Sequence, residues 1–188
     1  MAETKRILVA LVENRAGVLN RVASLLRRRG FNIESIAVGR SEMVGLSRMT
    51  FVIGGASEVV EQARKQLAKL IDVVKVSDIT DSDIVTRELA LIKVHTTSVT
   101  RGEIMQIVDI FRANIIDVAY DSVTIEITGD EDKIDSLINL LRSYGIKETS
   151  RTGRIATIRG GASPVPAEEK LYAARKRGRS SAKGSPVK

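Results

Sequence analysis

LVENRAGVLNRVASLLRRRGFNIESI, residues 11–36, is the stretch that decides the fold. An apolar run (7–12) predicts a strand that stops at a turn carrying Asn14 and Gly17. An amphipathic helix then extends to Gly30, and a second strand begins two residues later. A strand-to-helix turn with glycine at the helix start leaves free backbone N–H groups at the positive end of the helix dipole. We therefore expect this turn to bind a small carboxylate, and no residue near it is suited to covalent chemistry.

The hydrophobic pattern on either side extends this stretch to a complete βαββαβ unit. Its expected elements are strand 6–13, helix 17–29, strand 31–40, strand 45–54, helix 57–70 and strand 72–80. Ser57 is the expected N-cap of the second helix. This order is typical of the ferredoxin-like fold, in which both helices cover one face of an antiparallel sheet.

The same order repeats in the second half of the chain. The expected elements there are strand 87–96, helix 101–112, strand 114–120, strand 122–129, a helix capped by Asp130 and strand 146–159. Asn32-Ile33 align with Asn114-Ile115, an offset of 82 residues. The predicted fold class is therefore α+β, with two consecutive ferredoxin-like domains at 1–80 and 87–160 and a linker at 81–86.

The positive net charge is concentrated at the end of the chain. The whole chain carries +7, and residues 161–188, with seven basic and two acidic side chains, carry +5 of it. This segment is rich in Gly, Ala, Ser, Pro, Lys and Arg, so we predict a disordered basic tail. The folded body is near neutral and gives little electrostatic reason to expect a nucleic-acid partner.

Composition excludes several classes of function. The chain has no cysteine and one histidine, His95, so we predict neither a thiolate nor a multi-histidine metal site. No apolar run reaches the roughly 20 residues of a membrane helix, and the first residues lack the apolar core of a signal peptide. A cytoplasmic protein is expected. We find neither an acid/base cluster nor a Gly-rich phosphate loop, so no catalytic residue is predicted.

Several motifs resemble the regulatory (small) subunit of acetolactate synthase, also called acetohydroxyacid synthase, whose first domain is an ACT domain. The motifs that carry the resemblance include ENRAGVL at 13–19, RGFNIESI at 29–36, LSRMT at 46–50, REL at 87–89 and IFRANIIDV at 110–118. Together they keep the family's order and spacing over roughly residues 5–160. The tail lies beyond the part that resembles the family.

The resemblance implies a subunit without catalytic activity of its own. It would bind and activate a catalytic subunit that carries thiamine diphosphate, magnesium and FAD, and confer feedback inhibition by valine in branched-chain amino-acid synthesis. The first domain would form a homodimer, with the effector between subunits. The effector-binding residues carried over from the family are Asn14, Arg15, Ala16, Gly17 and Val18 in the turn, and Asn32 and Ile33 from the neighbouring subunit.

The residues by themselves leave alternatives open. Gly17, Asn14 and Asn32 could serve only as ordinary turn residues, and the preferred effector among valine, leucine and isoleucine is undecided. At the offset of 82 residues Gly17 corresponds to Val99, so only the first half is expected to bind the effector.

A rival function from another class is an RNA-binding module, because the RNA recognition motif shares the βαββαβ order. Phe51 is the aromatic residue that the third strand offers for stacking. A small enzyme on the same scaffold is a further rival, and the lack of an acid/base cluster argues against it.

Overall fold

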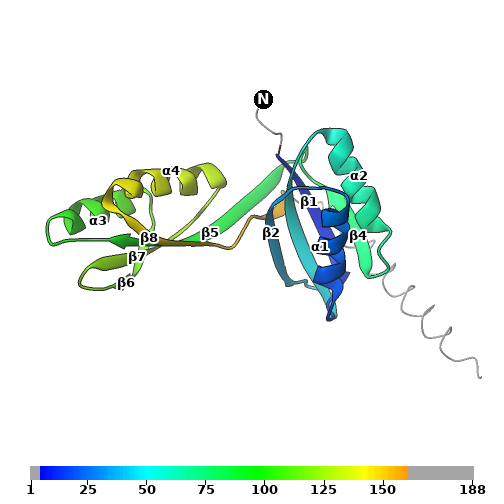
Figure 1. The fold of residues 1–188 in the computed structure, drawn as a ribbon, viewed down its shortest axis with the longest axis horizontal. Helices are drawn as coiled ribbons and strands as arrows, with labels where there is room; N and C mark the ends of the chain where they lie inside the picture. Colours follow the sequence, from blue (N-terminus) through cyan, green and yellow to red (C-terminus); the bar gives the residue numbers. More distant parts are fainter. Residues whose placement is uncertain (1–4, 161–188) are drawn as a thin grey trace, which may run out of the picture. The chain divides into compact units, whose positions relative to one another are not determined.

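The computed structural model describes residues 5–160 and divides the chain into two compact units. Unit 1 comprises the residues up to Val85 together with those from Ala156 on, and unit 2 comprises Thr86–Ile155. Figure 1 traces the chain through both units. The predicted tail, 161–188, lies outside the described residues.

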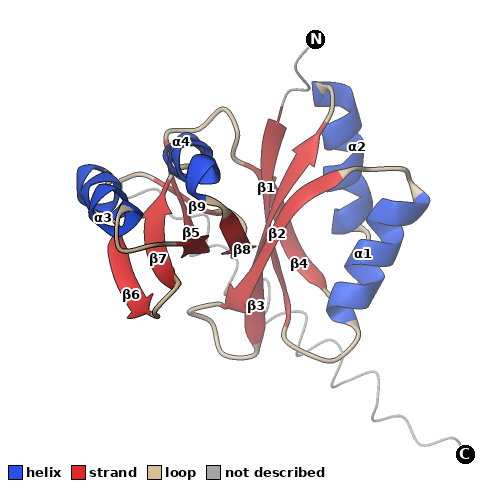
Figure 2. Cartoon of the chain, turned by 60° about the vertical axis from the view of Figure 1, so that its left-hand side comes forward, coloured by secondary structure: helices blue, strands red, loops and turns tan. Residues whose placement is uncertain are grey.

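Unit 1 has the predicted βαββαβ order. Its elements are β1 (Lys5–Glu13), α1 (Val18–Arg28), β2 (Ile33–Arg40), β3 (Leu46–Gly54), α2 (Ser57–Ala68) and β4 (Val73–Asp78). The strands form an antiparallel sheet in the order β2-β3-β1-β4. Figure 2 shows α1 and α2 beside one face of this sheet. The ferredoxin-like fold predicted for this half is confirmed.

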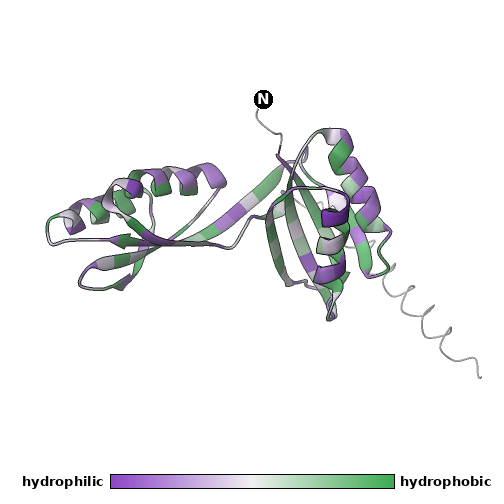
Figure 3. Cartoon of the chain, viewed as in Figure 1, coloured by the Kyte–Doolittle hydropathy of each residue, from purple (hydrophilic) through white to green (hydrophobic). Residues whose placement is uncertain are grey.

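The core of unit 1 lies between the sheet and its two helices. Alternate residues of β1 and β3 point into it, because successive side chains of a strand face opposite sides. Leu8, Val12 and Phe51 are fully buried there, packed with Val22 and Leu26 of α1. The helices show alternating apolar and polar stretches in Figure 3, as expected when only one face of a helix is buried.

The opposite face of the unit 1 sheet is also covered in part. Ile7, Val9 and Ile79 form a second, smaller cluster with Ala156 and Ile158. The last two residues belong to β9 (Ile155–Ile158), which pairs with β5. The chain therefore returns to unit 1 after completing unit 2.

This return corrects the prediction of one long strand at 146–159. The structure has β8 (Ile146–Arg151) and then β9, with Gly153 between them at φ +78°. A positive φ is incompatible with an extended strand, so the ladder ends there and a new strand begins. Residues 147–154 contain no apolar side chain, so hydrophobic periodicity did not locate the break.

Unit 2 repeats the topology of unit 1. Its elements are β5 (Ile84–His95), α3 (Thr100–Ile110), β6 (Asn114–Val118), β7 (Ser122–Gly129), α4 (Glu131–Leu141), a short 3-10 helix (Arg142–Tyr144) and β8. The sheet order is β6-β7-β5-β8, and Ile92, Ile125 and Leu137 are fully buried in the core. The predicted cap of α4 is confirmed, since Lys133 N–H donates to Asp130 Oδ1 at 3.0 Å.

Smaller differences concern element ends. The segment 81–86, predicted as a linker, contains the start of β5. Ser57 is the first residue of α2 and not its N-cap: the cap position is held by Ala56, with no side-chain hydrogen bond. Within residues 5–160, none of the helices is both long enough and apolar enough to cross a membrane.

Candidate functional site

The turn between β1 and α1 is the first candidate site. It is anchored at its start by Asn14, whose N–H donates to the carbonyl oxygen of Gly45 at 2.8 Å. Gly17 is the N-cap of α1, with φ +84° and no side-chain hydrogen bond to the helix. A Cβ added at Gly17 would meet no atom within 4 Å. Glycine is therefore favoured here by the left-handed backbone and not by crowding, and the position is open to a ligand.

This turn leaves several backbone donors unused. In the described part of the chain, the N–H groups of Ala16, Gly17 and Leu19 have no hydrogen-bond acceptor. The residues from Asn14 to Gly17 are all exposed. Unpaired N–H groups at the start of a helix, reinforced by the helix dipole, bind anions. The predicted donor array is thus present and accessible.

Arg15, predicted to contact the effector, is engaged by carboxylates of its own chain. Its guanidinium hydrogen-bonds to Asp72 and lies 3.0 Å from Glu13 Oε2. Arg21 Nη1 donates to the other oxygen of Asp72 at 2.5 Å. The Arg15 and Arg21 side chains are about half exposed, whereas that of Asp72 is 2% exposed.

Asp72 stays charged in spite of its burial. Burial by itself opposes the carboxylate, but the hydrogen bonds from Arg15 and Arg21 outweigh it and hold the pKa of Asp72 below its ordinary value. Asp72 also accepts through its main chain, from Glu13 N–H at 2.9 Å. Asp72 therefore ties the end of β1 and the start of α1 to the start of β4. No local sequence pattern pointed to this role of Asp72, because its partners lie 51 and 57 residues away.

The side chains of Val18 and Ile33, two of the predicted effector-binding residues, pack in the core of unit 1. Val18 is 2% exposed and packs between sheet and helices, and Ile33 packs against the same cluster. The backbone of Val18 still forms the first residue of α1. Its side chain is directed away from the solvent side of the turn.

Asn32 and Ile33 lie at the other end of the sheet from Gly17. Ile33 pairs with Ile53, which in turn pairs with Arg6 near the start of β1, whereas the turn follows Glu13 at its end. At about 3.4 Å per strand residue, the two ends are roughly 24 Å apart. One chain therefore does not bring the two predicted parts of the site together.

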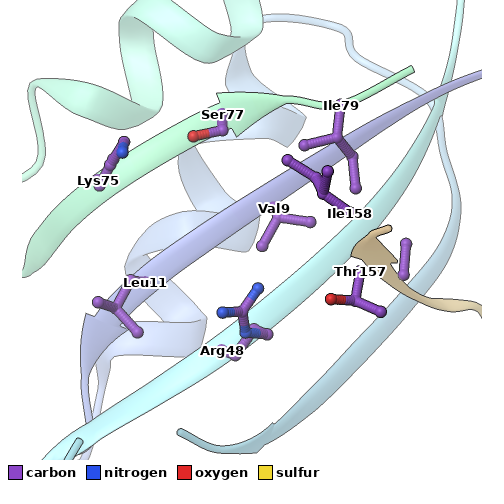
Figure 4. A pocket seen from close by; sticks show the side chains of 9 residues that line it. Val9, Leu11, Arg48, Lys75, Ser77, Ile79, Thr157 and Ile158 are labelled. Carbon is purple, nitrogen blue, oxygen red and sulfur yellow. The ribbon is translucent and has the colours of Figure 1, made fainter. Parts of the chain in front are cut away.

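A second candidate lies on the face of the unit 1 sheet opposite the helices. Figure 4 shows this pocket, with side chains from β1, β3, β4 and β9 around it. Arg48 and Lys75 supply positive charge, and Val9, Leu11 and Ile158 supply apolar walls. The enclosed space is about 30 Å³, which holds little more than water. An amino acid does not fit inside this pocket, so the turn remains the better site.

Comparison with protein families gives the class of protein first. Residues 8–75 match a family described as the AHAS small subunit-like ACT domain. Residues 87–160 match a family described as the small subunit of acetolactate synthase. Unit 1 is thus an ACT domain, and unit 2 is the domain that accompanies it in these small subunits.

Relatives that match over nearly their whole length belong to the same family. The chain is 58% identical over 156 residues to a probable acetolactate synthase small subunit of Archaeoglobus fulgidus, covering 83% of this chain and 98% of the relative. It is 54% identical over 157 residues to the acetolactate synthase small subunit of Bacillus subtilis, covering 83% and 91%. The crystal structure of the acetolactate synthase small subunit from Thermotoga maritima is 43% identical, with a TM-score of 0.79 and coverage of 85% and 99%. The chain belongs to the family of acetolactate synthase small, regulatory subunits.

Proposed function

We propose that this chain activates a catalytic subunit of acetolactate synthase in the cytoplasm and makes that subunit sensitive to valine. The chain itself performs no catalysis, and thiamine diphosphate, magnesium and FAD belong to the partner. The observation that carries the effector assignment is the turn at Gly17, with exposed N–H groups that have no acceptor in the described chain. Because these donors converge at the positive end of a helix, they suit the carboxylate of an amino acid.

The rest of the effector is recognised by a second copy of the chain. Asn32 is exposed at the far end of the sheet, where its side-chain oxygen can accept a hydrogen bond from an ammonium group. Since roughly 24 Å separates Asn32 from the Gly17 turn within one chain, a site using both requires two chains. This supports a homodimer formed through the ACT domains, with two equivalent effector sites.

Arg15 has a supporting role in this scheme. Asp72 and Glu13 already pair with its guanidinium, so its positive charge is largely compensated. We propose that Arg15 fixes the shape of the turn and leaves the backbone N–H groups to bind the carboxylate. The donors then need no rearrangement when the effector arrives, which lowers the cost of binding.

The first test is calorimetric titration of the full chain with valine, leucine and isoleucine, with glycine as the control. We expect saturable binding of at least one branched-chain amino acid and none of glycine. Equal affinity for glycine would contradict an effector site that recognises the side chain.

A complementation experiment tests the two-chain site directly. Gly17→Asp and Asn32→Ala homodimers should each bind valine poorly, by like-charge repulsion in the first and loss of roughly 1–3 kcal/mol in the second. A mixed dimer of the two variants contains one site with both defects and one site with neither. We therefore expect mixed dimers to regain one site of normal affinity for every two chains. If mixing restores nothing, Asn32 does not act across the interface.

The rival RNA-binding function loses its structural basis. Phe51, the aromatic residue that could have stacked a base, is 0% exposed and lies in the core beneath the helices. Phe31 packs against that core, and Phe111 and Tyr144 pack against the core of unit 2. Base recognition on this fold needs aromatic side chains on the open face of the sheet, and in residues 5–160 these aromatics are packed elsewhere.

A further inference from the structure

Unit 2 contains a pocket at the place that corresponds to the effector turn of unit 1. At the offset of 82 residues, Asn14 corresponds to Thr96 and Gly17 to Val99. The pocket encloses about 330 Å³ where β5 ends, α3 begins and the β6–β7 turn passes. It is lined by His95, Thr96, Thr97, Ser98, Arg101, Tyr120 and Asp121. Its size suits a ligand of a few heavy atoms, in contrast to the pocket on the unit 1 sheet.

Arg101 provides the pocket with a positive charge. Its Nη2 donates to the carbonyl oxygens of Ala119 and Tyr120, at 2.9 and 2.8 Å. These partners are neutral, and no carboxylate of the described residues pairs with this guanidinium. Its Nε is buried and has no hydrogen-bond partner in the described structure. A buried guanidinium N–H without an acceptor is rare.

The carboxylate in the pocket is already neutralised. Lys147 Nζ donates to Asp121 Oδ2 at 2.5 Å, and this hydrogen bond holds the pKa of Asp121 below its ordinary value. The pair contributes no net charge, so the charge of Arg101 dominates the pocket. His95 adds a ring that can donate a hydrogen bond.

The start of α3 adds backbone donors beside Arg101. Thr97 and Thr100 cap each other, because the N–H of each donates to the hydroxyl of the other at 3.0 and 3.2 Å. The N–H groups of Ser98 and Val99 have no acceptor in the described chain. We propose that this pocket binds a small oxyanion, of the carboxylate or phosphate type, through Arg101, Ser98 and His95. The anion would supply the counter-charge that Arg101 lacks.

The proposal is independent of valine binding at Gly17 and can be tested on the isolated full chain. The probes are acetate and inorganic phosphate, each compared with chloride at equal ionic strength, and the readout is two-dimensional NMR of backbone N–H groups and arginine Nε–H. We expect saturable shifts at Ser98, Val99 and Arg101 Nε–H with acetate, phosphate or both. The two probes distinguish a carboxylate ligand from a phosphate ligand.

Variants separate the pocket from general charge effects. Ser98→Asp places an anion in the pocket beside Arg101, and Arg101→Gln removes the cation. We expect each to weaken oxyanion binding at least tenfold, whereas Arg142→Gln, which removes an exposed charge of the same unit, should have no effect. The proposal is wrong if neither probe gives saturable shifts, or if all three variants respond like the unmodified chain.

Discussion

The two units share one topology, yet they begin and end their first helices differently. At the start of α1, Gly17 adopts φ +84° and no side chain caps the helix. At the corresponding place in unit 2, Thr97 and Thr100 cap each other through their hydroxyls. Unit 1 therefore keeps more of its helix-start donors for a ligand, whereas unit 2 satisfies part of them within the chain. A repeated fold can thus retain its core while the two copies leave different groups free at the start of the first helix: backbone N–H groups of the glycine turn in unit 1, and the Arg101 pocket in unit 2.

The ends of these helices differ as well. Gly30 follows α1 at φ +71°, and the corresponding residue after α3 is Arg112 at φ +49°. Both positions reverse the chain into the next strand and need a left-handed residue. Glycine adopts that conformation without strain, whereas arginine does so at a cost in free energy. The backbone at Arg112 in unit 2 is therefore strained, whereas the backbone at Gly30 in unit 1 is not.

The largest expected effect comes from changing Gly17, the residue that sets the start of α1 apart from the start of α3. In Gly17→Asp a carboxylate competes for the free N–H groups and repels the carboxylate of the effector. We expect valine affinity to fall on the order of 100-fold or more, with activation of the catalytic subunit retained. Inhibition curves with the reconstituted enzyme would measure both effects.

Two controls separate charge from backbone strain. Val99→Asp introduces the same charge at the corresponding position of unit 2 and should leave valine inhibition unchanged. Gly17→Ala adds no charge and should weaken valine only modestly, through a left-handed alanine that costs roughly 1–2 kcal/mol. Undiminished valine inhibition in a folded Gly17→Asp chain would remove the effector from this turn.

The next largest effect concerns β9, which pairs with β5 and packs its Ala156 and Ile158 against the sheet of unit 1. Ending the chain after Arg154 removes Ala156 and Ile158 and exposes Ile7 and Val9 to water. We expect the free energy of unfolding of unit 1 to fall by about 2–3 kcal/mol, measured by denaturant titration. Ending the chain after Gly161 should change neither stability nor the valine response. Equal stability of both truncations would mean that β9 contributes nothing to unit 1.

Local patterns were enough to predict the elements, but not the long-range contacts. The periods of the apolar residues predicted both βαββαβ units, and Asp130 was identified as a cap because it acts on Lys133, three residues away. The partners of Asp72 lie 51 and 57 residues distant, so no local pattern pointed to that ion pair. The position of β9 on unit 1 likewise depends on contacts between opposite ends of the chain.

In the candidate site, too, the local feature was predictable from the sequence and the long-range contacts were not. The glycine at the start of α1 was visible in the sequence, because its place before an amphipathic helix is a local feature. The engagement of Arg15 by Asp72, and the burial of Val18, follow only from the folded arrangement.

Asp72 offers a prediction about pH that is specific to unit 1. Its pKa is lowered in the folded chain, so its contribution to stability is present above the ordinary value of about 3.9 and is lost as pH falls through the lowered one. Asp72→Asn should lower the free energy of unfolding of unit 1 by about 1–2 kcal/mol at neutral pH, because the neutral amide no longer forms ion pairs with Arg15 and Arg21. The difference between variant and unmodified chain should shrink on acidification. Asp117→Asn, on exposed β6, is the matched control and should show neither effect.

The smallest expected effect tests the strain at the end of α3. Arg112→Gly replaces a left-handed arginine by the residue that occupies the corresponding place in unit 1, and Arg112 is exposed and forms no described ion pair. Relief of the strain outweighs the greater freedom of glycine in the unfolded chain, so we expect unit 2 to gain about 0.5–1 kcal/mol. The reverse change, Gly30→Arg, should destabilise unit 1 by a similar amount. Denaturant titrations of both variants would measure these changes in the free energy of unfolding. A loss of stability in Arg112→Gly would show that the Arg112 side chain makes a favourable contact that offsets its backbone strain.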